Sequence, residues 1–147
     1  KMQQSNYLKE LGAKNIIERK EFEVEPKLLG KGLWDGVVDT VGGTVLANAI
    51  SQTKPSGIIA ACGNAGGIKL NTSVMPFIIR GVKLWGIDSV MISKKRRDFI
   101  WSQVEKFIDF KILEKTTSTI KLEELLNIFP KMLKGEVSGR VLVDLNK

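Results

Sequence analysis

Residues 58–67, Ile58-Ile59-Ala60-Ala61-Cys62-Gly63-Asn64-Ala65-Gly66-Gly67, decide the fold. Five uncharged, mostly apolar residues in a row predict a strand that is buried on both faces, which is typical of the centre of a parallel sheet. The glycine-rich residues that follow predict a loop at the carboxyl end of this strand. Pro55-Ser56-Gly57, just before it, predicts a turn.

Strand and helix patterns alternate on both sides of this stretch. Alternation of this kind predicts an α/β fold, in which helices cover both faces of a parallel sheet. Thr44 is expected to cap the helix that follows the glycines at 42 and 43. The expected strands cover residues 15–18, 35–41, 58–62, 83–88 and 140–145, and the expected helices cover 6–11, 44–52, 73–80, 93–108 and 122–133.

The composition excludes several kinds of catalytic and metal site. The 147 residues include no His, which excludes Ser–His–Asp and Cys–His catalysis and His-ligated metals, and a single Cys, which excludes a cysteine zinc cluster. No metal site is therefore expected. A lone Cys also excludes a disulfide framework and favours a reducing, cytoplasmic location. No apolar run approaches the length of a membrane span, and because the chain begins with Lys1 we expect a piece of a longer protein.

The net charge of +7 raises the question of an anionic partner. The dense cluster, Lys94-Lys95-Arg96-Arg97, is more typical of a solvated helix face. Nucleic-acid binding modules usually add interleaved aromatic residues or a recognition motif, and the sequence contains neither. Nucleic acid is therefore not the expected partner.

Three loops at the carboxyl ends of expected strands are candidates for ligand binding, because such loops collect free backbone N–H groups. They are residues 41–44, 62–67 and 88–89. For Gly42-Gly43 alone, a tight turn and a ligand contact remain equally open, whereas three glycines and an amide favour ligand binding at 62–67. The motifs G-x-G-x-x-G and G-x-x-x-x-G-K-[ST] do not occur. Either the ligand is not a dinucleotide, or the motif precedes Lys1.

Four other chemically reactive side chains near these loops are interpreted as structural. Cys62 is expected to be a small buried residue, because an apolar strand raises the pKa of a thiol. Asp35, Asp39 and Asp88 are expected to cap neighbouring loops rather than act as acids.

Five segments together resemble those of a known family: residues 7–13, 34–42, 60–67, 75–81 and 86–91. They are similar to segments of medium-chain dehydrogenase/reductases, in particular the zinc-independent branch of quinone oxidoreductases and acrylyl-CoA reductases. The resemblance implies a partial Rossmann fold, a doubly wound parallel sheet that lacks its first two strands and the G-x-G-x-x-G turn. Residues 1–147 would be the C-terminal part of the dinucleotide-binding domain with a C-terminal helix and strand, and the N-terminal substrate domain would be absent.

The same resemblance implies that NADPH is the cofactor. Lys1 and Arg19 would lie near its 2′-phosphate, in agreement with the preference of a dianion for Lys and Arg. Asn64, Ile79 and Ser89 would line the nicotinamide side, and Arg140 would reach back to the cofactor. The full set of implied cofactor-binding residues is Lys1, Arg19, Gly42, Gly43, Gly63, Asn64, Ile79, Ser89 and Arg140.

The implied reaction is hydride transfer from NADPH to a small-molecule substrate, either an α,β-unsaturated carbonyl such as an acrylyl-CoA thioester or a quinone. The family also implies a homo-oligomer, a dimer. No catalytic residue is assigned to this chain, which we expect to be inactive alone. Two alternatives remain: a non-enzymatic α/β module that binds anionic partners or nucleic acid, and an inactive fragment.

Overall fold

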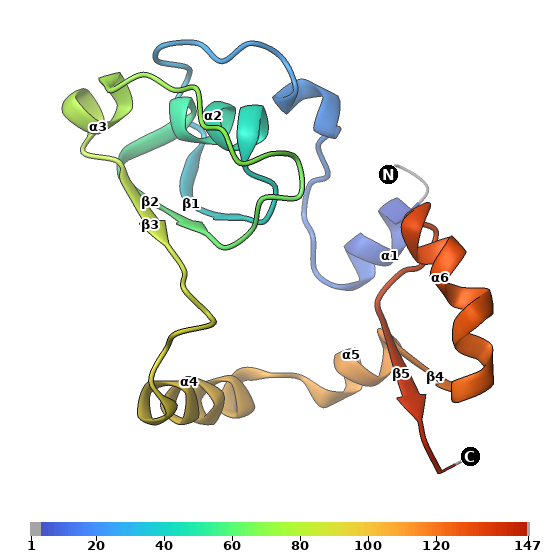
Figure 1. Ribbon diagram of the computed structural model, residues 1–147. Coiled ribbons are helices and arrows are strands. Elements are labelled where there is room, and N and C mark those ends of the chain that lie inside the picture. Colours follow the sequence, from blue (N-terminus) through green and yellow to red (C-terminus); the bar gives the residue numbers. More distant parts are fainter. Residues whose placement is uncertain (1–3, 147) are drawn as a thin grey trace. The chain divides into compact units, whose positions relative to one another are not determined.

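The computed structural model describes residues 4–146 (Figure 1). The chain divides into two compact units. One unit is Ile16–Ser93, and the other combines Lys1–Asn15 with Lys94–Lys147. In the described part of the chain, no helix has the length and apolar character needed to cross a membrane.

The unit Ile16–Ser93 is built on a three-stranded parallel sheet in the order β1-β2-β3. Strand β2 is central, as its uniformly apolar sequence predicts. The α/β prediction is confirmed, because helices connect the strands and both strand pairs are parallel. The elements are η2 (Arg19–Phe22), β1 (Trp34–Asp39), α2 (Gly43–Ser51), β2 (Thr53–Ala61), α3 (Met75–Arg80) and β3 (Lys83–Gly86).

The core of this unit lies on one face of the sheet, where α2 and α3 cover it (Figure 1). Leu46 and Ile50 of α2 pack against Ile59 of β2. On the other face of the three-stranded sheet, Val38 is 77% exposed and Trp85 is 56% exposed. Crossovers between parallel strands are right-handed, and the strand order β1-β2-β3 advances in one direction, so α2 and α3 lie on the same face.

The second unit contains a pair of parallel strands, β4 and β5. Near the start of β5, the Arg140 N–H donates to the carbonyl of Thr116 at 2.8 Å, and Gln4 Nε2 donates to Ser138 Oγ at 2.6 Å. These bonds tie β5 to β4 and to the residues before the first helix. The elements are α1 (Ser5–Glu10), α4 (Lys94–Phe107), α5 (Phe110–Lys115), β4 (Thr117–Lys121), η3 (Leu122–Glu124), α6 (Leu125–Leu133) and β5 (Arg140–Asp144).

Three local predictions are corrected. Residues 15–18 form no strand, since none of the described residues pairs with them in a ladder. Residues 55–57 belong to β2, where the pairing register jumps, rather than to a separate turn. Thr44 is not the N-cap of α2: the helix begins one residue earlier, with Gly42 as its N-cap, and no described side chain caps it.

Candidate functional site

The loops after β1 and β2 contact each other through their backbones. We call residues 40–43 the first glycine loop and residues 62–67 the second glycine loop. The Gly66 N–H donates to the carbonyl of Val41 at 2.7 Å, and the Ala65 N–H donates to that of Thr40 at 3.3 Å. Gly42 and Gly67 form a parallel bridge. The two loops therefore make one continuous backbone surface at the carboxyl ends of β1 and β2.

This contact explains why two of the positions are glycine. Gly42 has φ +71°, and a Cβ there would lie 2.5 Å from the carbonyl oxygen of Gly67. A Cβ on Gly63 would lie 2.6 Å from the carbonyl oxygen of Thr40. Distances this short require backbone movement, so close approach of the two loops alone accounts for these glycines. Their roles as cofactor contacts stay predictions.

Two aspartates shape neighbouring loops, as predicted, and the third does not. Asp39 is 4% exposed and accepts hydrogen bonds from the N–H groups of Gly42, at 3.0 Å, and Val41, at 3.2 Å. Asp88 accepts hydrogen bonds from the N–H groups of Val90 and Met91 in the loop after β3. Asp35 instead forms an exposed ion pair with Lys54, at 2.7 Å, so its predicted capping role is wrong. The prediction that Cys62 is buried is also wrong, because the residue follows the last position of β2 and is exposed.

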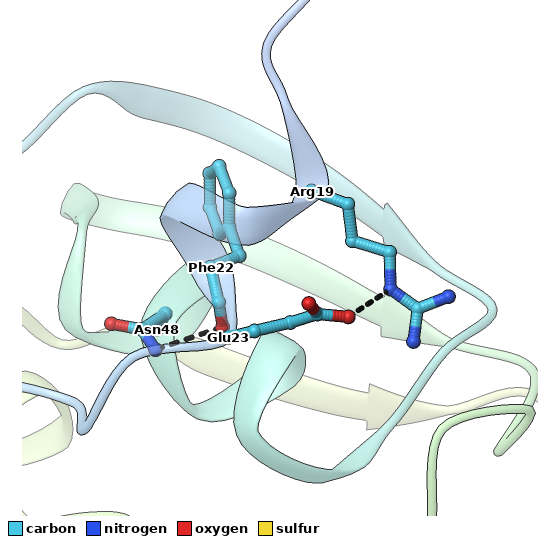
Figure 2. A network of polar contacts seen from close by, with 4 residues as sticks. All are labelled: Arg19, Phe22, Glu23 and Asn48. Carbon is cyan, nitrogen blue, oxygen red and sulfur yellow. Dashed lines mark hydrogen bonds and ion pairs between the residues drawn. The ribbon is translucent and has the colours of Figure 1, made fainter. Parts of the chain in front are cut away.

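Arg19 lies beside the second glycine loop. Its Nη2 is 3.4 Å from the position that a Cβ on Gly66 would occupy. Its Nε forms an ion pair with Glu23 Oε1 at 2.7 Å, which leaves the outer edge of the guanidinium for other contacts (Figure 2). The Arg19 side chain is 60% exposed. The structure thus places a positively charged, solvent-accessible guanidinium group against a glycine-rich backbone, as expected of an anion site.

Asn48, which the sequence analysis missed, anchors the segment that carries Arg19. It is 3% exposed and lies in α2. Its Nδ2 donates to the carbonyl of Phe22 at 3.0 Å (Figure 2). The same nitrogen lies 2.7 Å from the carbonyl oxygen of Val24 and 3.2 Å from that of Thr44, so its two hydrogens are shared among three acceptors. The available signal was a polar amide in the middle of an apolar helix, where a side chain is buried only if it has partners.

Asn64 and Ser89 lie near the same edge of the sheet. Asn64 belongs to the second glycine loop, is exposed, and its Cα lies 3.3 Å from where a Cβ on Gly42 would be. Ser89 lies two residues after Ile87. The N–H of Ile87 donates to the carbonyl of Ala61 at 2.9 Å, and this bond extends β3 beside the end of β2. The structure therefore brings both to the carboxyl ends of neighbouring strands.

Asp88 gives the loop at Ser89 its conformation. Its Oδ1 accepts hydrogen bonds from the N–H groups of Met91 and Val90, each at 2.9 Å, and these bonds lower the pKa of Asp88 below its ordinary value. A carboxyl group with a lowered pKa stabilises the folded loop above its unfolded pKa, and this contribution disappears as the pH falls through the folded pKa.

We therefore expect an NMR titration of the Asp88 carboxyl carbon to give a pKa below the ordinary aspartate value. Replacement Asp88→Ala removes both acceptor bonds, so the amide protons of Val90 and Met91 should exchange faster at neutral pH. Asp35→Ala is the matched control, because Asp35 makes an exposed ion pair away from this loop. Unchanged exchange in Asp88→Ala would contradict the assigned role.

The structure describes the local surroundings of two of the three remaining predicted site residues. Ile79 is 57% exposed in α3, next to Arg80, whose guanidinium binds the carbonyl of Thr53 at the amino end of β2. Arg140 begins β5 in the other compact unit and donates to the carbonyl of Gly139. Lys1 lies outside the described residues. Cofactor contacts by these three residues stay predictions.

Comparisons with known proteins identify relatives of this chain. Residues 1–109 match the model of the family described as zinc-binding dehydrogenase. Acrylyl-CoA reductase AcuI of Ruegeria pomeroyi is 40% identical over 143 residues, which are 97% of this chain and 43% of that protein.

Two solved structures share the fold. The yhdH oxidoreductase of Salmonella enterica, in complex with NADP, has a TM-score of 0.93 and 40% identity over 99% of this chain and 44% of its own. Bacillus subtilis yhfP, with NAD bound, has a TM-score of 0.89 and 35% identity over 97% of this chain and 44% of its own.

These relatives bear out the Rossmann-type fold and the family that the sequence motifs indicated. The chain spans less than half the length of each relative. The family match covers most of the chain, from residue 1 to residue 109, and includes both glycine loops. The chain therefore belongs to the zinc-binding dehydrogenase family of the medium-chain dehydrogenase/reductase superfamily.

Proposed function

We propose that this chain supplies part of the NADPH site of an oxidoreductase. The full protein would reduce a small-molecule substrate, either an α,β-unsaturated carbonyl such as an acrylyl-CoA thioester or a quinone. Residues 1–147 would be the C-terminal part of its dinucleotide-binding domain, with the C-terminal helix and strand, and the full protein would form a homodimer. Relatives that are an acrylyl-CoA reductase and an oxidoreductase in complex with NADP support the proposal.

The observation that carries the proposal is the position of Arg19. A guanidinium whose Nε is held by Glu23 presents its remaining N–H groups beside Gly66 of the second glycine loop. Arginine and glycine-rich backbone together recognise phosphate, by charge-assisted hydrogen bonds and by close approach. A dinucleotide without the 2′-phosphate is recognised at the equivalent place by a carboxylate, so Arg19 favours NADPH.

The chain's own residues have binding and orienting roles in this proposal. Arg19 would bind the 2′-phosphate, and the glycine loops would let the backbone approach a flat ligand closely. Asn64 and Ser89 would contact the nicotinamide end from the carboxyl ends of β2 and β3. When bound, the nicotinamide supplies the hydride, and the protein orients it and excludes competing reactions.

Zinc appears in the family's description, but the residues of this chain do not fit a zinc site. The sequence contains no His, and the described residues 4–146 contain no group of three or more Cys, Asp or Glu side chains that could hold a metal ion. The proposed reaction uses no zinc held by these residues.

Replacement Arg19→Gln in the full-length gene product tests the proposal. Loss of charge-assisted hydrogen bonds of about 1.5–3 kcal/mol should raise the Kd for NADPH about 10- to 100-fold. The Kd for NADH should stay within about twofold, because that cofactor has no 2′-phosphate. Isothermal titration calorimetry with both cofactors gives the two values.

Lys95→Gln is the control for net charge, since it removes one positive charge from the exposed cluster in α4. It should leave both dissociation constants unchanged. If Arg19→Gln weakens NADPH and NADH equally, or weakens neither, Arg19 does not select the phosphorylated cofactor and the proposed function loses its principal support.

A further inference from the structure

We propose that Asn48 is a positioning residue that sets the preference of this protein for NADPH over NADH by holding Arg19 in place. The inference rests on the proposed function, because it assigns to Asn48 the support of the guanidinium that would bind the 2′-phosphate. Asn48 itself is 3% exposed and is not expected to touch the cofactor. Its effect would pass through the backbone of residues 19–24.

The geometry that carries the inference is a pair of hydrogen bonds from one amide nitrogen to two points of the same segment. Asn48 Nδ2 donates to the carbonyl of Phe22, the last residue of η2 (Figure 2). It also donates to the carbonyl of Val24, two residues later. Arg19 is the first residue of η2. A single turn of 3-10 helix therefore separates the anchored carbonyl from the arginine, and fixing one end restrains the other.

A third bond restrains the amide itself. Asn48 Nδ2 also lies 3.2 Å from the carbonyl of Thr44, one turn earlier in α2. Because α2 follows directly from Gly42 and the first glycine loop, Asn48 links the Arg19 segment to the helix that starts at the loop surface. The arginine and the glycine backbone are thus positioned by the same helix.

The packing of η2 against α2 is incomplete, because a cavity borders residues of both. A cavity of about 360 Å³ lies under η2 and is lined by Ile17, Phe22, Val24, Trp34 and Asn48, among others. The rings of Phe22 and Trp34 make one tilted contact, with centroids 6.3 Å apart. A segment that borders a cavity depends on its directional hydrogen bonds more than one embedded in a close-packed core.

The ion pair of Arg19 with Glu23 cannot replace this anchor. Both partners belong to the same segment, four residues apart, and their side chains are 60% and 46% exposed. Exposed ion pairs of this kind contribute little to stability. The pair orients the guanidinium relative to η2, whereas Asn48 orients η2 relative to α2. Bidentate recognition of phosphate depends on the direction of the guanidinium plane. It therefore needs both the ion pair with Glu23 and the hydrogen bonds of Asn48.

The test is a double-mutant cycle in the full-length gene product, made of Asn48→Ala, Arg19→Gln and the combination. Calorimetric Kd values for NADPH and NADH are measured for each protein. We expect Asn48→Ala to raise the Kd for NADPH about tenfold and that for NADH less than about twofold. In the Arg19→Gln background, Asn48→Ala should leave the ratio of the two constants unchanged.

Thr53→Val is the matched control for a purely structural effect. Thr53 is fully buried, and its Oγ1 donates to the carbonyl of Ala49 at 2.7 Å, so the substitution breaks a buried bond at the other end of α2. It should lower the free energy of unfolding without changing the ratio of the Kd values for NADPH and NADH. Asn48→Ser is the second variant if Asn48→Ala does not fold. Its hydroxyl can bond to the carbonyl of Thr44 but is too short to hold residues 22 and 24.

The outcomes separate the two proposals. If Arg19→Gln lowers the preference for NADPH and neither Asn48 variant does, the role of Asn48 is overturned and the proposed function stands. If Arg19→Gln leaves the preference unchanged, the proposed role of Arg19 fails and that of Asn48 fails with it. A change of preference in Thr53→Val, or one by Asn48→Ala that persists without Arg19, would also overturn the positioning role.

Discussion

Replacement Gly42→Ala is expected to lower the free energy of unfolding by about 3 kcal/mol or more, the largest effect of any conservative change near the site. Gly42 has φ +71° and ψ −160°, a region that is nearly restricted to glycine and costs other residues about 1–3 kcal/mol. In addition, the new Cβ would lie 2.5 Å from the carbonyl oxygen of Gly67. That oxygen is backbone, so relief requires the two glycine loops to move apart.

Separation of the loops should also affect binding. The hydrogen bond from the Gly66 N–H to the carbonyl of Val41 closes the contact, and Arg19 lies against Gly66. We expect Gly42→Ala to weaken NADPH and NADH together, because the shared loop surface is lost. This pattern differs from the selective loss expected of Arg19→Gln.

Urea denaturation followed by tryptophan fluorescence measures the stability change. Gly86→Ala is the matched control: a Cβ there would meet no described atom within 4 Å, and its φ is not in the left-handed region. Its free energy of unfolding should change by no more than about 0.5 kcal/mol. A similar small change in Gly42→Ala would show that the loops are not held together at this point.

The central strand and its loop could be predicted because their signals are local. An uninterrupted apolar run followed by glycines specifies β2 and the second glycine loop without reference to other segments. The expected strand at 15–18 failed for the opposite reason. Its apolar residues fit a strand, but a strand exists only when another segment pairs with it, and none of the described residues does.

Strand β4 shows the opposite case, a strand that pairing creates where the local sequence does not predict one. Thr117–Lys121 is short and polar, and no strand was predicted there. It forms because β5 pairs with it in parallel, with Thr117 opposite Arg140. Pairing over more than twenty residues leaves no local trace in a polar sequence, so single-sequence reasoning does not find it.

The candidate site divides in the same way. The glycine loops and Arg19 could be proposed from the sequence, the first from composition and the second from the family resemblance. The long-range partners of Asn48 and Arg80 could not, because they are backbone carbonyls 24 to 50 residues away. Any residue has a carbonyl, so the sequence of the partner contains no sign of the bond.

Replacement Arg80→Met is the second change expected to have a large effect. Arg80 Nη1 donates to the carbonyls of Ser51, at 3.1 Å, and Thr53, at 2.9 Å, and its Nη2 donates to the carbonyl of Gly30. One side chain thus joins the end of α2, the start of β2 and the loop before β1. Methionine keeps most of the apolar stem but no donor.

We expect Arg80→Met to lower the free energy of unfolding by about 3 kcal/mol, since three half-buried carbonyls lose a charged donor. The measurement is urea denaturation, with Lys83→Met as the control. Lys83 is exposed in β3 and also changes a cation to methionine. Its replacement should alter stability by less than about 0.5 kcal/mol.

Arg80→Lys decides whether charge or geometry is responsible. Lysine keeps the positive charge but offers one compact ammonium in place of the planar fork that reaches carbonyls of three separate segments. If the fork is what matters, Arg80→Lys should lose nearly as much stability as Arg80→Met. Stability close to that of the unmodified protein would mean that a positive charge suffices, and that the three bonds of Arg80 contribute little to joining α3 to the amino end of the sheet.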